Sequence, residues 1–163
     1  LWIVVVSVGA ANTSGRATTA TVGPPLDLLA EWKGFPVHTD DDPLDLAHKK
    51  EKHLPGLTQA GDKARIFLPH AQSEEHHVQA MWVEHEATGE VVCFVSAMGK
   101  YPSSDNGKLM SSEAHVMAQC TLPAEHRFGG KLVPYLQCNL DGLWRGKPHE
   151  DARKELPLAG AEL

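Results

Sequence analysis

Positive charge is scarce in this chain, in which 15 lysine and arginine residues stand against 21 aspartate and glutamate residues, for a formal net charge of −6. Nucleic-acid binding depends on clustered lysine and arginine side chains that release counterions from phosphates. The shortage therefore argues against a nucleic-acid partner. It also means that an anionic substrate has to be attracted by a local positive patch, because the field of the whole protein opposes it.

Cysteines and long apolar runs are also few. Three cysteines, Cys93, Cys120 and Cys138, do not make a disulfide framework. The apolar run Leu1–Ala11 is shorter than the roughly 20 residues of a membrane span, so none is expected. This run is typical of the hydrophobic region of a signal peptide, with a transit peptide and a buried first strand as alternatives. We expect export to the periplasm in the first case, and a cytoplasmic or organellar location otherwise.

The length of 163 residues fits one domain, which we expect to span residues 31–150. Residues 1–30 are interpreted as a targeting remnant and linker, and residues 151–163 as a tail. No internal repeat, heptad pattern or phosphate-binding loop interrupts the chain. The pattern of short segments predicts an all-β sandwich, with strands at 64–68, 77–84, 90–97, 114–121 and 131–138, a hairpin turn at 87–89 and a polar loop at 100–112.

Three local features refine this expectation. The strand His77–Glu84 alternates, which places Val78, Ala80 and Trp82 on one face. Pro134 places the strand 131–138 at a sheet edge or a bulge, because proline cannot donate a ladder hydrogen bond. The charged segment 40–52 is expected to be exposed, with one helical turn at 44–49.

Histidine, in contrast, is abundant, with ten residues in the chain. Three clusters contain candidate metal ligands: His53, then His70 and His76, and finally Cys138 with Asp141. Imidazoles suit iron, copper, zinc and nickel, and a thiolate adds a soft, electron-rich donor. Such a mixed set differs from the closed, cysteine-rich pattern of structural zinc sites. Because a sandwich gathers its loops at one end, the sequence predicts a single reactive metal centre there.

The three clusters resemble, in the same order, the ligand motifs of the superoxide reductases, the neelaredoxin and desulfoferrodoxin ferrous iron-binding family. Glu51-Lys52-His53-x-Pro55 resembles their EKHxP loop, and Pro69-His70 followed by Glu75-His76-His77 resembles the loop with their second and third ligands. Cys138-Asn139-x-x-Gly142-x-Trp144 resembles their CNxHGxW loop. Upstream, Trp32-Lys33-Gly34 resembles the WKG of neelaredoxins. The chain contains no cluster of four cysteines, which a rubredoxin-like domain would have. The resemblance is therefore to the single-iron class.

The resemblance implies an immunoglobulin-like β-sandwich with a mononuclear non-haem iron (Fe2+/Fe3+), held by four histidines and an axial cysteine thiolate. It implies an antioxidant oxidoreductase that reduces superoxide by one electron to hydrogen peroxide, uses an electron donor such as rubredoxin and often forms tetramers. His53, His70 and His76 would then be equatorial ligands and Cys138 the axial one. Glu51 would cap the ferric iron, and Lys52 would attract superoxide and help to position a proton-donating water.

The chain departs from the family at Asp141, where the family has histidine. This carboxylate either ligates the metal, or leaves four protein ligands, or gives its place to another histidine such as His126. Two other functions therefore remain open: a non-catalytic metal-binding or electron-transfer protein on the same scaffold, and a metal-free adhesion or partner domain. A second departure is the 16-residue insertion 35–50, for which a tolerated surface loop is favoured over a lid or a partner surface.

For four other residues a structural role is expected. His77 should face away from the metal, since adjacent strand residues point to opposite faces. Cys93 and Cys120 lie in no ligand or nucleophile motif, and Trp144 is expected to pack in the core.

Overall fold

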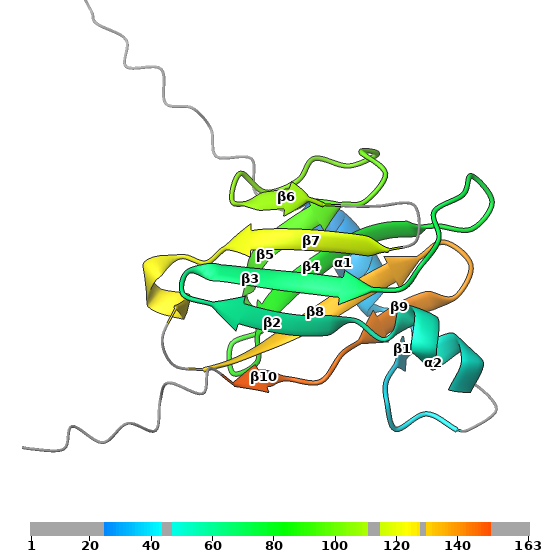
Figure 1. Cartoon of the computed structure of the whole chain (residues 1–163), viewed down its shortest axis with the longest axis horizontal. Helices are drawn as coiled ribbons and strands as arrows, with labels where there is room; N and C mark the ends of the chain where they lie inside the picture. The colour runs from blue at the N-terminus through cyan, green and yellow to red at the C-terminus, as the bar shows by residue number, and fades with distance from the viewer. Residues whose placement is uncertain (1–24, 44–46, 111–114, 128–129, 151–163) are drawn as a thin grey trace, which may run out of the picture.

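The computed structural model describes residues 25–43, 47–110, 115–127 and 130–150. The apolar run Leu1–Ala11, most of the linker after it and the tail 151–163 lie outside these residues. Two β-sheets face each other as a sandwich (Figure 1), which confirms the all-β fold class. None of the helices in the described ranges is long and apolar enough to cross a membrane.

The larger sheet, sheet A, has the strand order β1-β9-β8-β4-β5, and β10 also pairs with β8. Its strands are β1 (Val37–His38), β4 (Val78–His85), β5 (Val91–Ser96), β8 (Lys131–Cys138), β9 (Gly142–Arg145) and β10 (His149–Glu150). Sheet B has the order β2-β3-β7-β6, with β2 (Gly56–Ala60), β3 (Lys63–Leu68), β6 (Gly107–Leu109) and β7 (Val116–Thr121). The helices are α1 (Leu26–Lys33), α2 (Ala47–His53) and the short 3-10 helix η2 (Ala124–His126).

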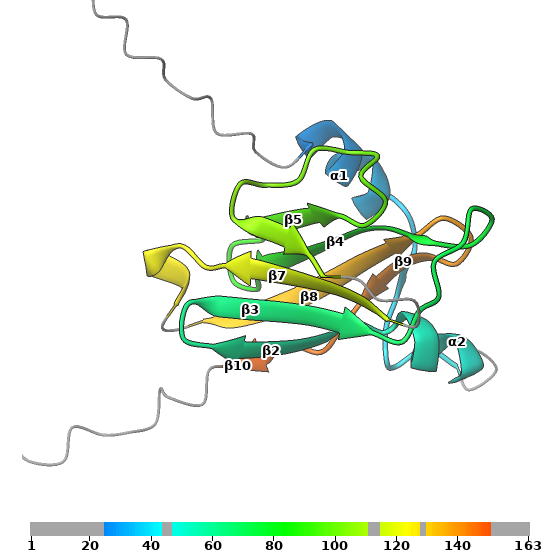
Figure 2. The same cartoon turned by 45° about the horizontal axis from the view of Figure 1, so that its top comes forward.

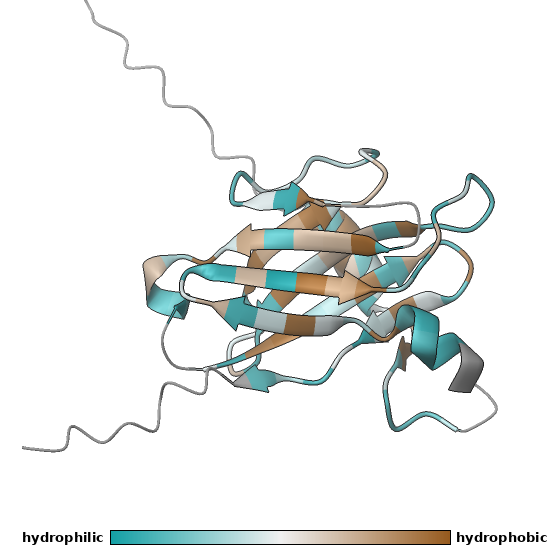
Figure 3. Cartoon of the chain, in the orientation of Figure 1, coloured by the Kyte–Doolittle hydropathy of each residue, from teal (hydrophilic) through white to brown (hydrophobic). Residues whose placement is uncertain are grey.

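The main core lies between the two sheets. Strand β3 shows why: Ala64, Ile66 and Leu68 point inward and are buried, whereas Arg65 and Phe67 between them are exposed. In Figure 3 this strand carries both teal and brown segments, and the exposed Phe67 is a hydrophobic residue. This period of two is the pattern of a strand with one face toward the core and the other toward solvent.

The predicted common face of Val78, Ala80 and Trp82 is wrong. Val78 packs in the core between the sheets, whereas Ala80 and Trp82 belong to a second buried cluster. The cause is an irregularity between Val78 and Ala80 in the pairing of β4 with β8. A β-bulge inserts one extra residue and so moves the following side chains to the other face.

The second cluster lies on the outer face of sheet A and is covered by helix α1, as Figure 2 shows most clearly. Trp32 of α1 stacks on Trp82 with 6.0 Å between ring centroids. Lys33 forms an ion pair of 2.6 Å with Glu84, whose carboxylate also accepts the Trp82 indole N–H. Helix α1 begins at Leu26, within the segment interpreted as a linker.

Strand β8 has the predicted bounds, but the expectation that Pro134 marks an edge or a bulge is wrong. The strand is central, with β4 on one side and β9 and β10 on the other. Pro134 lies between the residues that pair with β9 and those that pair with β10. Its carbonyl accepts a hydrogen bond from Gly146, and its nitrogen faces the same side. The missing N–H therefore lies where the neighbouring strand is interrupted, so no ladder bond is lost.

The insertion 35–50 contains regular secondary structure, whereas the sequence favoured a surface loop. Its residues Val37 and His38 form β1, which pairs in parallel with β9 and extends sheet A. The His38 ring packs against Trp144 at 4.7 Å. Helix α2 then begins at Ala47; residues 44–46 of the predicted helical turn lie outside the described part, and the helix continues to His53.

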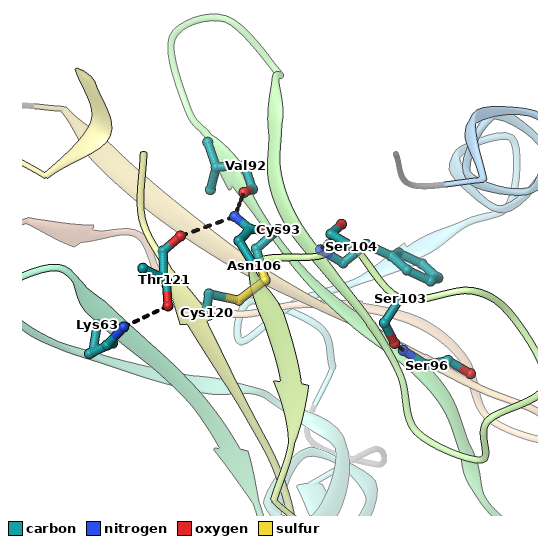
Figure 4. Close-up of a disulfide and its surroundings, with 10 residues drawn as sticks. Lys63, Val92, Cys93, Ser96, Ser103, Ser104, Asn106, Cys120 and Thr121 are labelled. Carbon is teal, nitrogen blue, oxygen red and sulfur yellow. Dashed lines mark hydrogen bonds between the residues drawn. A yellow bond between two sulfur atoms is a disulfide. The ribbon is translucent and has the colours of Figure 1, made fainter. Parts of the chain in front are cut away.

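Cys93 and Cys120 form a disulfide, which the cysteine count did not predict, although the expected structural role is confirmed. The bond joins β5 of sheet A to β7 of sheet B (Figure 4). Beside it, the Asn106 side-chain amide donates to the carbonyls of Val92 and Thr121, at 2.7 and 3.0 Å. The two sheets are thus tied together covalently and by hydrogen bonds at the same place.

The predicted polar loop 100–112 contains strand β6 and completes the edge of β5. The hydroxyl of Ser104 accepts a hydrogen bond from the backbone N–H of Phe94, and that of Ser103 accepts one from Ser96. These serines satisfy backbone groups that an edge strand otherwise leaves open.

Candidate metal centre

The metal-ligand candidates meet at one end of the sandwich, next to helix α2 in Figure 1. His70 lies just after β3, and His76 just before β4. Cys138 is the last residue of β8, and His53 is the last residue of α2. His53 therefore ends a helix, although its motif resembles a loop of the family, and the gathering of the donors at one end is as predicted.

Four donor atoms converge there, one each from His53, His70, His76 and Cys138, and all lie within 4.8 Å of one another. The Nε2 atom of His53 is 3.1 Å from Nε2 of His70 and 3.4 Å from Nε2 of His76. The Cys138 sulfur is 3.9 Å from Nε2 of His70. His53, His70 and Cys138 are buried, and His76 is partly open to solvent. This cluster could hold a metal ion.

The hydrogen bonds of the outer ring nitrogens support this interpretation. Nδ1 of His53 lies 2.9 Å from the Lys49 carbonyl, one helical turn earlier, and Nδ1 of His70 lies 2.6 Å from the Ala71 carbonyl. A carbonyl accepts only, so each Nδ1 carries the proton and each Nε2 presents a lone pair. Lone pairs that face each other at 3.1 Å repel unless a cation lies between them. Histidine ligands are held in this way by a second hydrogen bond in metalloproteins.

The pKa values favour a metal ion over a proton as this cation. Burial lowers the pKa of His53, and burial together with the charge of His53 lowers the pKa of His70 to about 4. Both imidazoles therefore stay neutral at physiological pH, which is the form that binds metals. Burial raises the pKa of the Cys138 thiol, while the backbone N–H groups of Asp141 and Leu140 oppose that shift. A bound metal ion reverses the effect of burial, because a coordinating thiol is deprotonated.

A tight turn between β8 and β9 shapes the cysteine side of the centre. Gly142 closes this turn with a φ of +77°, a backbone conformation that favours glycine. The turn brings the Asp141 backbone N–H within 3.5 Å of the Cys138 sulfur. The turn thus directs both Cys138 and Asp141 toward the cluster.

Asp141 borders the cluster on the side of two histidines. Its Oδ2 atom lies 3.1 Å from Nε2 of His53 and 3.0 Å from Nε2 of His76, and its Oδ1 atom forms an ion pair of 2.6 Å with Lys49. Burial alone would raise the pKa of Asp141, but the hydrogen bond and the charge of Lys49 hold it below its usual value. The carboxylate is therefore ionised beside the cluster.

The Trp144 side chain is buried, as expected, and also contacts the centre. Its ring stacks on His53 with 5.4 Å between centroids and an interplanar angle of 23°. Its indole N–H donates to the Asp141 carbonyl at 2.9 Å. Trp144 thus supports both the helix side and the turn side of the cluster.

Asn139 is a functional candidate that the sequence reasoning did not single out. Its side-chain oxygen accepts a hydrogen bond from the His77 backbone N–H, and its amide nitrogen donates to the Glu75 carbonyl, both at 2.8 Å. These two bonds flank His76 and fix its loop to the cysteine turn. The place of Asn139 in the Cys138-Asn139 motif was the available signal.

We expect the substitution Asn139→Ala to weaken metal binding about 10- to 100-fold, the usual cost of losing a group that orients a ligand. The loop of the half-buried His76 would lose both side-chain bonds to Asn139 and keep only the backbone bond from the Asn139 N–H to the His77 carbonyl, whereas His53 and His70 would keep their own partners. Competition with a chelator of known affinity measures the change. Asn106→Ala, far from the cluster beside the disulfide, is the matched control, and equal losses in both variants would contradict the expectation.

Four of the residues that the sequence singled out lie apart from the four donors. The His77 ring turns to the carbonyls of Ser73 and Glu74, away from the cluster, as predicted. His126 contacts His85 and Glu90 instead, near the end of the sandwich opposite to Cys138. Its recruitment as a ligand is therefore wrong. Glu51 and Lys52 are exposed on α2, and their roles stay predictions.

Comparison with known proteins agrees with this geometry. A search of curated proteins returned no match. The family model described as Desulfoferrodoxin matches residues 45–147, a range that includes all four converging donors, Asp141 and the whole of helix α2. This range covers more than half of the chain. The chain belongs to the desulfoferrodoxin family.

Proposed function

We propose that this protein is a superoxide reductase, with a mononuclear iron held by His53, His70, His76 and Cys138. The observation that supports the proposal most strongly is the convergence of three imidazole nitrogens and one sulfur within 4.8 Å, in a chain of this family. When bound, ferrous iron supplies the single electron that converts superoxide, together with two protons, into hydrogen peroxide.

The protein's own groups support such a site in two ways. The buried sulfur of Cys138 accepts a hydrogen bond from the Asp141 backbone N–H. This bond moderates the charge of the thiolate and fixes the orientation of the Cys138 side chain. Helix α2, which ends at the candidate ligand His53, also carries the exposed lysine Lys52 next to it. In a protein of net charge −6, Lys52 supplies the local positive charge that an anionic substrate requires, because Lys49 is paired with Asp141 and Lys50 with backbone carbonyls.

The test is the reaction of the iron-loaded, reduced protein with superoxide under anaerobic conditions. We expect one hydrogen peroxide for each superoxide consumed and no release of oxygen, because a reductase oxidises its iron and does not oxidise superoxide. A rate no faster than that of free ferrous iron would contradict the proposal. Oxygen release in equal amount to peroxide would indicate dismutation instead.

A non-catalytic metal-binding or electron-transfer protein is the second candidate, and Asp141 is the observation that favours it. Its ionised carboxylate lies next to two imidazoles and adds a negative charge that repels superoxide. The substitution Asp141→His separates the two functions. If the natural protein is a reductase, both forms react with superoxide; if only the histidine variant reacts, the natural protein is of the second kind.

A further inference from the structure

Lys49 contacts the metal centre through two different groups. Its backbone carbonyl accepts the hydrogen bond from Nδ1 of His53, and its ammonium group holds Oδ1 of Asp141 at 2.6 Å. Residues four apart on a helix lie one above the other, which explains why Lys49 and His53 face the same side of α2. One residue therefore organises the helix side and the turn side of the centre together.

The ion pair also determines the orientation of the carboxylate. Because Oδ1 is held by Lys49, Oδ2 is the oxygen that faces the Nε2 atoms of His53 and His76, at 3.1 and 3.0 Å. The Asp141 side chain is only 12% exposed, so the position is protected from water, whereas Lys49 is 40% exposed. Oδ2 therefore borders the four-donor cluster, next to two of its three imidazole nitrogens.

Charge gives the pair a second role. The thiolate of Cys138 and the carboxylate of Asp141 would bring two negative charges to the centre. Lys49 supplies the one cation that directly contacts either of them among the described residues. With Lys49 in place, the fixed charge of the centre equals that of a thiolate with neutral ligands alone.

We propose that Lys49 is the positioning residue of the metal centre, holding Asp141 with Oδ2 directed at the metal as a fifth ligand and offsetting its charge. The proposal rests on the proposed function in that it assumes a metal at the cluster, but it does not depend on superoxide chemistry. The cation predicted from the sequence was Lys52, and no role was predicted for Lys49.

Cobalt(II) is a suitable probe, because its visible absorption reports the number and type of its ligands without any redox reaction. We expect Asp141→Asn to change this spectrum and to weaken cobalt binding at least about tenfold. Lys49→Met should change the spectrum in the same direction, and Lys49→Arg, which keeps the charge and the donor, should restore it. Lys108→Met, at an exposed lysine on β6, is the matched control and should leave the spectrum unchanged.

The double variant Lys49→Met with Asp141→Asn tests whether Lys49 acts through Asp141. Residues that act through one contact are not additive, so the second substitution should add little to the first. In the iron-loaded protein, Lys49→Met should also lower the reduction potential, because it removes a positive charge that disfavours ferric iron. The unfolding midpoint of each variant confirms that it is folded.

Two results would overturn the proposal: a cobalt spectrum of Lys49→Met equal to that of the natural protein, or a full effect of Lys49→Met in the Asp141→Asn background. Both are distinct from a failure of the proposed function. A protein that binds cobalt with the expected variant spectra, but does not reduce superoxide, would retain the Lys49 role and lose the reductase assignment.

Discussion

The substitution Cys138→Ser should abolish the visible colour of the oxidised, iron-loaded protein and weaken metal binding about 100-fold. A hydroxyl is a poor ligand compared with a thiolate, and the binding free energy of a four-ligand site is about 10–16 kcal/mol, or roughly 3 kcal/mol for each ligand. The three imidazoles would remain, so some metal should still bind. Iron analysis after dialysis and the visible spectrum measure both effects.

The control for this variant is the removal of the two other cysteines, which are buried and form the disulfide. Cys93 and Cys120 are bonded to each other away from the cluster, and their removal should leave the spectrum of the metal centre intact. Serine fits the space of cysteine, so the variant is expected to fold. An unchanged band between ferric iron and sulfur in Cys138→Ser would contradict the ligand assignment.

The double variant Cys93→Ala with Cys120→Ala should lose about 3–4 kcal/mol of unfolding free energy. The bond closes a loop with a sequence separation of 27 residues, and the chain-entropy relation gives this magnitude for such a loop. The corresponding fall in melting temperature is about 10 °C for a domain of this size. Denaturant unfolding in the absence of reductant measures the change, and the natural protein with added reductant should approach the variant. A loss below about 1 kcal/mol would contradict a structural role for the bond.

The disulfide also bears on where the protein matures. Disulfides form and persist in oxidising compartments and are rare where thiols are kept reduced. Since Cys93 and Cys120 are buried and joined across the two sheets, we propose that the protein functions in such a compartment, in agreement with the signal-peptide interpretation of Leu1–Ala11. Alkylation of the metal-free protein in denaturant, before and after reduction, should reveal one free cysteine in the first case and three in the second.

The sequence was most informative where the signal is local. The bounds of β8 were predicted to the residue, and β3, β4, β5 and β7 to within two residues. The order and spacing of the three motifs also identified the four donors that the fold brings together. Helix α2 was only partly predicted, because its residues AHKKEKH have no apolar stripe. Its helical form depends on tertiary contacts, such as the stacking of His53 on Trp144.

Contacts between distant segments were the part that could not be predicted. Lys49 and Asp141 are 92 residues apart, and from the sequence alone several other lysines could equally well pair with this carboxylate. The cysteine pairing depends in the same way on which strands face each other. The irregularity between Val78 and Ala80 changes the face to which the following side chains of β4 point, and nothing in the composition of the strand indicates it.

The most direct test of the central claim is the iron content and visible spectrum of the natural protein, purified without oxygen and then mildly oxidised. We predict one iron per chain and a thiolate-to-iron charge-transfer band that colours the protein blue to green and is absent in Cys138→Ser. Absence of iron, or iron without this band, would contradict the claim that His53, His70, His76 and Cys138 hold a mononuclear iron.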